Sequence, residues 1–306
     1  MSTNPLPSPS PDQTFVTVSP LAAGFITLPD TAFVAPADKD AKRTVPSLVF
    51  LITHPGNDSS NNKPFRMMFD LGLRKSASRY PEVLQNHISS RAPYHLEPGV
   101  AAQLKLGCLD PDDVDLILLS HVHYDHHGDP EDFFNAQFRV GFGALGVLKN
   151  GLGGMASHQH FDPETLPQDG RTRELSDPKS PEWKPLGPFP ATLDFFGDGS
   201  VFVVDLPGHL PGHVGLLCRM NSEKWVMLCG DAYHDRRLLT GEKEIGEWEG
   251  KDGGRLCIHL DQKGAEKSIR RLREFDALTG EACELVAAHE EGWWERNSER
   301  AFPGVL

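Results

Sequence analysis

The chain has 306 residues, of which 39% are hydrophobic and 24% charged, and this composition is typical of a globular protein with material for a sizeable core. Its 43 acidic and 30 basic residues give a formal net charge of -13, so we expect no nucleic acid among its partners. The 5 cysteines are odd in number and none has C-x-x-C spacing, which argues against a disulfide framework and a cysteine zinc site.

The chain start and its apolar runs bear on location. No Lys or Arg precedes Lys39, and no apolar stretch of secretory type follows the first residue. No apolar run reaches the length of about 18 residues that a membrane-spanning helix needs. We therefore expect a cytoplasmic protein that does not contact membranes, and no pattern bears on its oligomeric state.

The composition of the chain changes near residue 45, where apolar runs typical of strands begin. Residues 1–44 begin with a run rich in Pro and Ser, and we interpret them as an N-terminal arm that is partly disordered. Residues 45–306 form the expected domain. The apolar run 47–52 predicts a buried strand, and residues 65–70 predict its antiparallel partner, which ends at Asp70.

Strands and helices then alternate along the domain. A helix is predicted at 100–107, and a buried strand at 114–119 runs directly into His121. Residues 141–198 are dense in Gly and Pro and predict a long excursion over the surface, with a short helix near 133–142. Strand texture returns at 200–205, 215–218, 224–229 and 284–288, and helical spacing covers 264–278. This order favours packed sheets covered by helices.

The segment from Ser120 to Gly128 carries four metal-ligand side chains within six residues: His121, His123, Asp125 and His126. Imidazole and carboxylate groups hold zinc and similar divalent ions. His121 and His123 leave an extended segment on the same side, because successive side chains alternate. The sequence therefore predicts a metal site in the loop after a buried strand.

This H-x-H-x-D-H pattern resembles the signature of the metallo-β-lactamase superfamily. Further resemblances follow in family order: Asp70 before Leu71-Gly72, the loop Pro207 to His213, Gly230-Asp231, and His289 at the end of the last strand. The resemblance implies an α+β fold, a four-layer αββα sandwich. It also implies that His213, the second histidine of its loop, is a ligand, whereas His209 and His127 have structural roles.

By the same resemblance, two divalent ions, expected to be zinc, occupy the site. One ion is held by His121, His123 and His213, and the other by Asp125, His126 and His289, with Asp231 bridging them. Two ions about 3.5–4 Å apart share a water and make hydroxide available near neutral pH. A serine nucleophile is not expected, since the G-x-S-x-G pattern is absent.

This ligand set is similar to that of the lactonase branch, which includes the N-acyl homoserine lactonases. It implies a hydrolase that opens the ring of a small cyclic ester or amide. The sequence departs from the branch at one position: the lactonases have a tyrosine three residues after the bridging aspartate, where this chain has His234, preceded by Tyr233. Tyr233, His234 and Asp125 are therefore the candidates for the catalytic proton donor.

Several alternatives stay open. The substrate is a lactone, or a lactam opened in the detoxification of a xenobiotic. Thioester hydrolases and iron-dependent sulfur dioxygenases share the motif and are further alternatives. A group of aromatic residues either lines a ring-binding pocket or forms a local core: Phe133, Phe134, Phe138, Phe142, Phe161, Trp293 and Trp294.

Overall fold

The computed structural model describes residues 5–56, 63–152, 157–250 and 253–306, and within them two six-stranded sheets lie face to face. In spatial order, the first sheet contains β1 (Thr17–Pro29), β3 (Lys42–His54), β4 (Phe65–Phe69), β5 (Leu116–Leu118), β6 (Gln137–Val140) and β7 (Thr172–Glu174). The second contains β16 (Cys283–Val286), β12 (Trp225–Leu228), β11 (Val214–Arg219), β10 (Val201–Asp205), β9 (Phe189–Asp194) and β8 (Lys184–Leu186).

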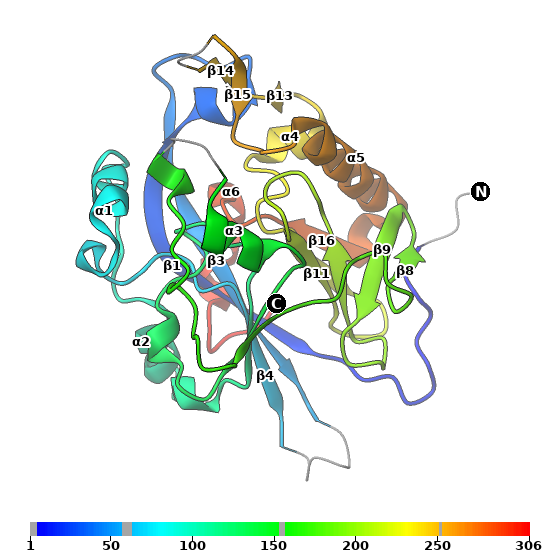
Figure 1. The fold of residues 1–306 in the computed structure, drawn as a ribbon. Helices are drawn as coiled ribbons and strands as arrows, with labels where there is room; N and C mark the ends of the chain where they lie inside the picture. Colours follow the sequence, from blue (N-terminus) through cyan, green and yellow to red (C-terminus); the bar gives the residue numbers. More distant parts are fainter. Residues whose placement is uncertain (1–4, 57–62, 153–156, 251–252) are drawn as a thin grey trace.

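The described residues also contain six α-helices, seven short 3-10 helices and two small two-stranded ribbons. The helices are α1 (Glu82–Ser89), α2 (Val100–Leu106), α3 (Ala144–Asn150), α4 (Arg236–Thr240), α5 (Gln262–Thr279) and α6 (Glu291–Asn297). One ribbon joins β2 (Val34–Ala35) to β13 (Glu244–Ile245), and the other joins β14 (Glu247–Glu249) to β15 (Arg255–Cys257). Figure 1 shows α1 and α2 on the side of β1, and α5 alongside the second sheet. No helix in the described ranges is long and apolar enough to cross a membrane.

The layers follow from strand alternation, because successive side chains point to opposite faces of a sheet. In β3, Phe50 and Ile52 enter the core between the two sheets, whereas Val49 and Leu51 pack on the side of α2 and α3. Residues of the second sheet divide in the same way, so that its outer face packs against the apolar side of α5. The result is the predicted αββα sandwich.

Three predictions about elements differ from the structure. Within residues 1–44, Thr17–Pro29 is a strand paired along its length with β3, and alternating residues such as Val18 and Ile26 are buried. Two prolines, Pro20 inside this strand and Pro29 at its end, are atypical of a paired strand and obscure the alternation in the sequence.

The region 133–198 also differs from its prediction. The helix near 133–142 is wrong: Gln137–Val140 is a strand parallel to β5, and its period of two is visible only in Phe138 and Val140. The excursion at 141–198 contributes a helix and three strands, one to the first sheet and two to the second. Strands this short are fixed by pairing with distant neighbours, which local sequence patterns do not record.

Candidate metal centre

The predicted ligands gather where strands of both sheets end. The first four, His121, His123, Asp125 and His126, follow β5, His213 immediately precedes β11, Asp231 follows β12, and His289 follows β16. All seven side chains are buried. Parallel pairing of β12 with β16, and of β4 with β5, brings the carboxyl ends of these strands to shared edges.

Asp231 lies at the centre of the cluster. Its Oδ1 is 3.3 Å from His126 Nε2 and 3.4 Å from His289 Nε2. Its Oδ2 is 3.8 Å from His121 Nε2. The Asp231 carboxylate thus faces residues from both predicted ligand groups, one for each ion. A ligand that bridges two ions requires this placement.

Three of the predicted imidazole ligands, His126, His213 and His289, are each oriented by a hydrogen bond at Nδ1. The Nδ1 of His213 donates to the Leu206 carbonyl at 3.0 Å, and the Nδ1 of His289 donates to the Pro46 carbonyl at 2.8 Å. The Nδ1 of His126 donates to the Asp70 carboxylate at 2.9 Å. Each bond leaves the lone pair of the ring on Nε2, and such outer contacts are characteristic of metal-binding histidines. In His213 this lone pair accepts the Asp231 N–H at 3.0 Å.

Asp70 supports the cluster without belonging to it. Besides His126 Nδ1, its carboxylate accepts the Ser120 N–H at 2.6 Å and the Ser120 Oγ–H at 2.7 Å. Its backbone adopts φ 63°, a left-handed conformation that Asp tolerates better than most residues. Asp70 therefore joins the end of β4 to the first turn of the loop that carries His121 to His126.

The electrostatics divide the histidines into two sets. Burial lowers the pKa of His121 and His123 well below the ordinary value, and it lowers the pKa of His213 to about 4. Burial also lowers the pKa of His126, but the carboxylates of Asp231 and Asp70 outweigh it and raise that pKa well above its ordinary value. The first set is neutral at physiological pH, which is the form that binds metal.

The cluster also contains buried polar atoms that lack a hydrogen-bond partner. His126 Nε2 and Asp231 Oδ1 are both fully enclosed and unsatisfied. Orphaned groups of this kind are costly in a protein interior. They face each other across the cluster at 3.3 Å, so a cation held between the carboxylate and the imidazoles would satisfy both. The residues therefore fit divalent ions.

Two further histidines reach the cluster: His209, which the resemblance assigns a structural role, and His259, which the sequence did not single out. His209 Nε2 lies 2.9 Å from His123 Nδ1, and its ligand atom falls within one group with those of His121, His123 and Asp231. Its other nitrogen faces His259 Nδ1 at 3.3 Å. The only signal available was a second imidazole in the loop Pro207 to His213, and His259 carried no signal.

The structure separates the two residues that follow the bridging aspartate. His234 lines the cavity above the cluster, and its Nε2 lies 3.0 Å from Asp231 Oδ2. Tyr233 belongs to the apolar core, fully buried, and does not line that cavity. Burial first, and then Glu290, raise the pKa of Tyr233 well above its ordinary value. Only His234 of the pair faces the site.

The cluster forms the floor of a cavity of about 300 Å³. Its apolar wall comes from two distant segments: Leu28 and Phe33 near the end of β1, and Trp248 and Ile258 around β14 and β15. Polar residues line the remainder: His87, Arg91, Tyr124, His158 and His209, with the predicted ligands His123, Asp125, Asp231, His289 and the neighbouring His234. A small organic molecule with an apolar body and one polar reacting group fits this lining.

The aromatic residues singled out from the sequence do not line this cavity. Phe133 and Phe138 are core residues below the first sheet, Trp293 packs between the sheets, and Phe134 and Phe142 are exposed. Phe161 alone stays close, with its ring stacked 5.7 Å from that of His123. A local core is therefore the role of most of these rings.

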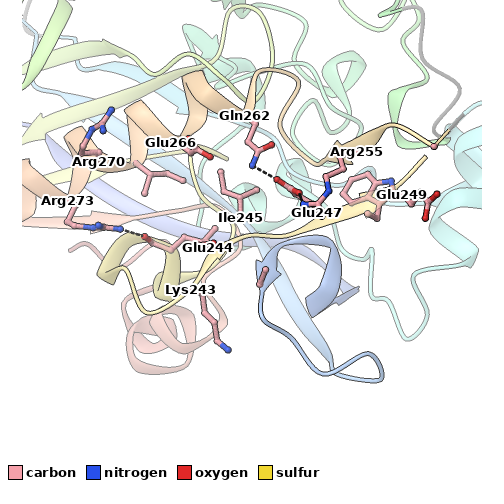
Figure 2. Close-up of a pocket in the computed structure, with 15 residues that line it drawn as sticks. Lys243, Glu244, Ile245, Glu247, Glu249, Arg255, Gln262, Glu266, Arg270 and Arg273 are labelled. Carbon is pink, nitrogen blue, oxygen red and sulfur yellow. Dashed lines mark hydrogen bonds and ion pairs between the residues drawn. The ribbon is translucent and has the colours of Figure 1, made fainter. Parts of the chain in front are cut away.

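A larger cavity of about 870 Å³ lies between α5 and the ribbon of β14 and β15. Figure 2 shows its lining of charged side chains, in which Glu247 contacts both Arg255 and Gln262. It includes none of the metal-ligand residues, and it shares only Trp248 with the cavity above the cluster. The chemistry therefore belongs to the smaller cavity.

Two facing sheets with imidazoles and carboxylates at their strand ends define the architecture of a metallo-hydrolase. The chain belongs to the metallo-beta-lactamase superfamily, whose sequence pattern matches residues 67–289. The matched segment runs from β4 to the last predicted ligand, and so contains every residue of the cluster.

Individual proteins resemble the chain over most of its length. Gamma-lactamase FDB1 of Fusarium pseudograminearum is 31% identical over 222 residues, which cover 71% of this chain and 48% of that protein. N-acyl homoserine lactonase AttM of Rhizobium radiobacter is 26% identical over 258 residues, covering 82% and 84%. A solved N-acyl homoserine lactone hydrolase, with N-hexanoyl-L-homoserine at its catalytic metal center, shares the fold with a TM-score of 0.65 at 19% identity, covering 96% and 100%.

The chain is shorter than several of the proteins that it matches. The matched part spans 30% of the length of two Penicillium relatives named cytochrome P450 monooxygenase. It spans 48% of the length of FDB1. It therefore corresponds to one part of those proteins.

Proposed function

We propose that this protein is a zinc-dependent hydrolase that opens the ring of a small lactone or lactam. The observation that carries the proposal is the carboxylate of Asp231, which faces two groups of buried ligands on the floor of a cavity of about 300 Å³. The gamma-lactamase and the N-acyl homoserine lactonase among the relatives support a cyclic amide or ester as the substrate.

Two zinc ions are the expected cofactors. His121, His123 and His213 would hold one ion, Asp125, His126 and His289 the other, and Asp231 would bridge them. When bound, the two ions would make water acidic enough to act as a nucleophile near neutral pH and would withdraw charge from the ring carbonyl. We favour His213 over His209 as the third imidazole, because its Nδ1 is anchored by a backbone carbonyl whereas that of His209 faces another imidazole.

This choice between the two histidines has its own test. His213→Ala should lose one zinc ion per chain, measured by elemental analysis after dialysis. His209→Ala should keep both ions with weaker retention, since it removes only an imidazole next to His123. Retention of both ions in His213→Ala would exclude that residue as a ligand.

The chain's own residues supply the orientation and the proton. The apolar walls around Phe33 and Trp248 would hold the body of the substrate, so that its ring carbonyl lies over the ligand cluster. Opening the ring leaves a negative charge on the departing oxygen or nitrogen. We propose that His234 donates the proton there, because it lines the cavity beside Asp231. Asp125, also in the cavity wall, is the second candidate.

The proposal is tested by a hydrolysis screen of lactones, lactams and thioesters, with zinc and iron content measured in parallel. Ring opening with two zinc ions per chain supports it. Turnover of thioesters alone, or one iron and no zinc, would contradict it. His234→Ala should lower turnover by about 100- to 10,000-fold with both ions retained. Tyr233→Phe is the matched control and should stay near wild type.

A further inference from the structure

Arg91 stands out among the cavity residues as a cation without an acidic partner. It follows α1 and is half-buried, and its Nε donates to His87 Nε2 at 3.4 Å. Among the described residues, no carboxylate lies within ion-pair distance of its guanidinium. Other arginines in the described part of the chain also lack a carboxylate partner, but Arg91 is the arginine that lines the cavity above the cluster.

Other arginines near the site are paired. Arg43 contacts Asp30 at 2.7 Å, Arg74 contacts Glu131 at 2.6 Å, and Arg79 contacts Asp129 at 2.7 Å. Arg237 lies 2.7 Å from Asp235. Their charges are neutralised by carboxylates of the protein, so they are structural. Arg91 is the exception, and it is also the one of these arginines that lines the cavity.

The imidazole beside Arg91 does not neutralise it. Burial, followed by the nearby charge of Arg91, lowers the pKa of His87 to about 3. His87 is therefore neutral at physiological pH. The guanidinium has further N–H groups available, since within the described ranges only its Nε donates to another side chain.

The position of Arg91 is fixed by its backbone. Its N–H donates to the Ile88 carbonyl at 2.8 Å, and its carbonyl accepts the Thr27 N–H at 3.0 Å. These bonds tie the end of α1 to β1, next to the apolar wall formed by Leu28 and Phe33. Because these hydrogen bonds already fix the backbone of Arg91, less conformational entropy is lost when its side chain binds a ligand.

From this placement we infer that Arg91 forms a subsite for an anionic substituent of the substrate, so that the cavity selects cyclic esters or amides that carry a carboxylate away from the reacting ring. The inference rests on the proposed function for the ring. A carboxylate matches the planar guanidinium and accepts two parallel N–H···O bonds from it. Arg91 donates to His87 and, among the described residues, to none of the proposed metal ligands, so we take this carboxylate to be distinct from the one formed when the ring opens.

The test compares two ring-opened probes whose acyl chains have equal length, N-succinyl-homoserine and N-butanoyl-homoserine. The succinyl chain ends in a carboxylate and the butanoyl chain in a methyl group. Dissociation constants for the zinc-loaded protein are measured by calorimetry. The wild type should bind the succinyl probe about 10- to 100-fold more tightly, the effect of one charge-assisted pair.

Arg91→Met should abolish this preference while leaving the butanoyl affinity and the zinc content unchanged, and Arg91→Lys should keep part of it. Lys149→Met, which removes an exposed positive charge on α3, controls for a general effect of charge. Equal binding of both probes by the wild type, binding of neither, or an unchanged preference in Arg91→Met would overturn the inference. A retained preference without any ring-opening activity would instead overturn the proposed function.

Discussion

Replacement of Asp70 tests how the fold orients the ligand loop. The Asp70 carboxylate accepts three buried hydrogen bonds, from Ser120 N, Ser120 Oγ and His126 Nδ1. Hydrogen bonds to a charged group contribute about 1.5–3 kcal/mol each and are not additive within one network. Alanine would also occupy φ 63°, which costs an L-residue roughly 1–2 kcal/mol. We therefore expect Asp70→Ala to lower the free energy of unfolding by about 4–6 kcal/mol.

Asp70→Asn separates the charge from the shape. Asparagine tolerates the left-handed backbone and keeps one acceptor for Ser120 N, but its amide cannot accept the His126 Nδ1–H as well. Asp70→Asn should therefore lower the free energy of unfolding by about 1–3 kcal/mol. Asp113→Ala, at an exposed carboxylate, should change stability by less than about 0.5 kcal/mol.

The assay is chemical denaturation followed by tryptophan fluorescence, with all variants at one fixed concentration of free zinc. The expected order of destabilisation is Asp70→Ala, then Asp70→Asn, then Asp113→Ala. A cost below about 1 kcal/mol for Asp70→Ala would refute the reasoning, because the three bonds would then contribute nothing measurable. If Asp70→Ala and Asp70→Asn lowered the free energy of unfolding equally, the charge of the carboxylate, rather than its shape, would account for its contribution.

Two further predictions concern the second sheet and its loop. Gly208→Ala should reduce zinc retention, because the new Cβ would lie 2.0 Å from the Ala265 backbone nitrogen and displace the loop that carries His213; Gly146→Ala, with nothing within 4 Å, is the control. Burial raises the pKa of Asp205 to about 6, so the folded protein loses stability as pH rises from about 4 to about 6. Asp205→Asn should therefore raise the free energy of unfolding by about 1–3 kcal/mol at pH 8 and have no effect near pH 4, and an equal gain at both pH values would contradict this.

The seven residues that the sequence predicts as ligands lie together in the structure, because each of them lies close to a strand end. A buried strand followed by His121 or Asp231 is a local pattern, and the sheets then bring the strand ends together. The cavity walls are different. Phe33, Arg91 and Trp248 come from segments far apart in the chain, and only packing of β1, α1 and the β14–β15 ribbon places them together. No local pattern distinguishes these residues from ordinary surface or core positions.

The same reasoning explains the roles that the sequence left open. Tyr233 and His234 are adjacent, so their opposite directions depend on how the chain leaves β12 after Asp231. Tyr233 turns into the core beneath the second sheet, and His234 turns toward the cavity. The sequence offers both residues as candidates for the proton donor, whereas in the structure only His234 of the two lines the cavity.

The measurement that tests the central claim most directly is the titration of zinc into metal-free protein while ring opening of a lactone or lactam is recorded. The account predicts no activity without metal and a rate that rises until about two zinc ions per chain are bound. In Asp231→Ala, which lacks the bridge, the rate should stay lower by several orders of magnitude at any zinc concentration. Full activity in the metal-free protein, saturation at one ion, or normal turnover in Asp231→Ala would contradict it.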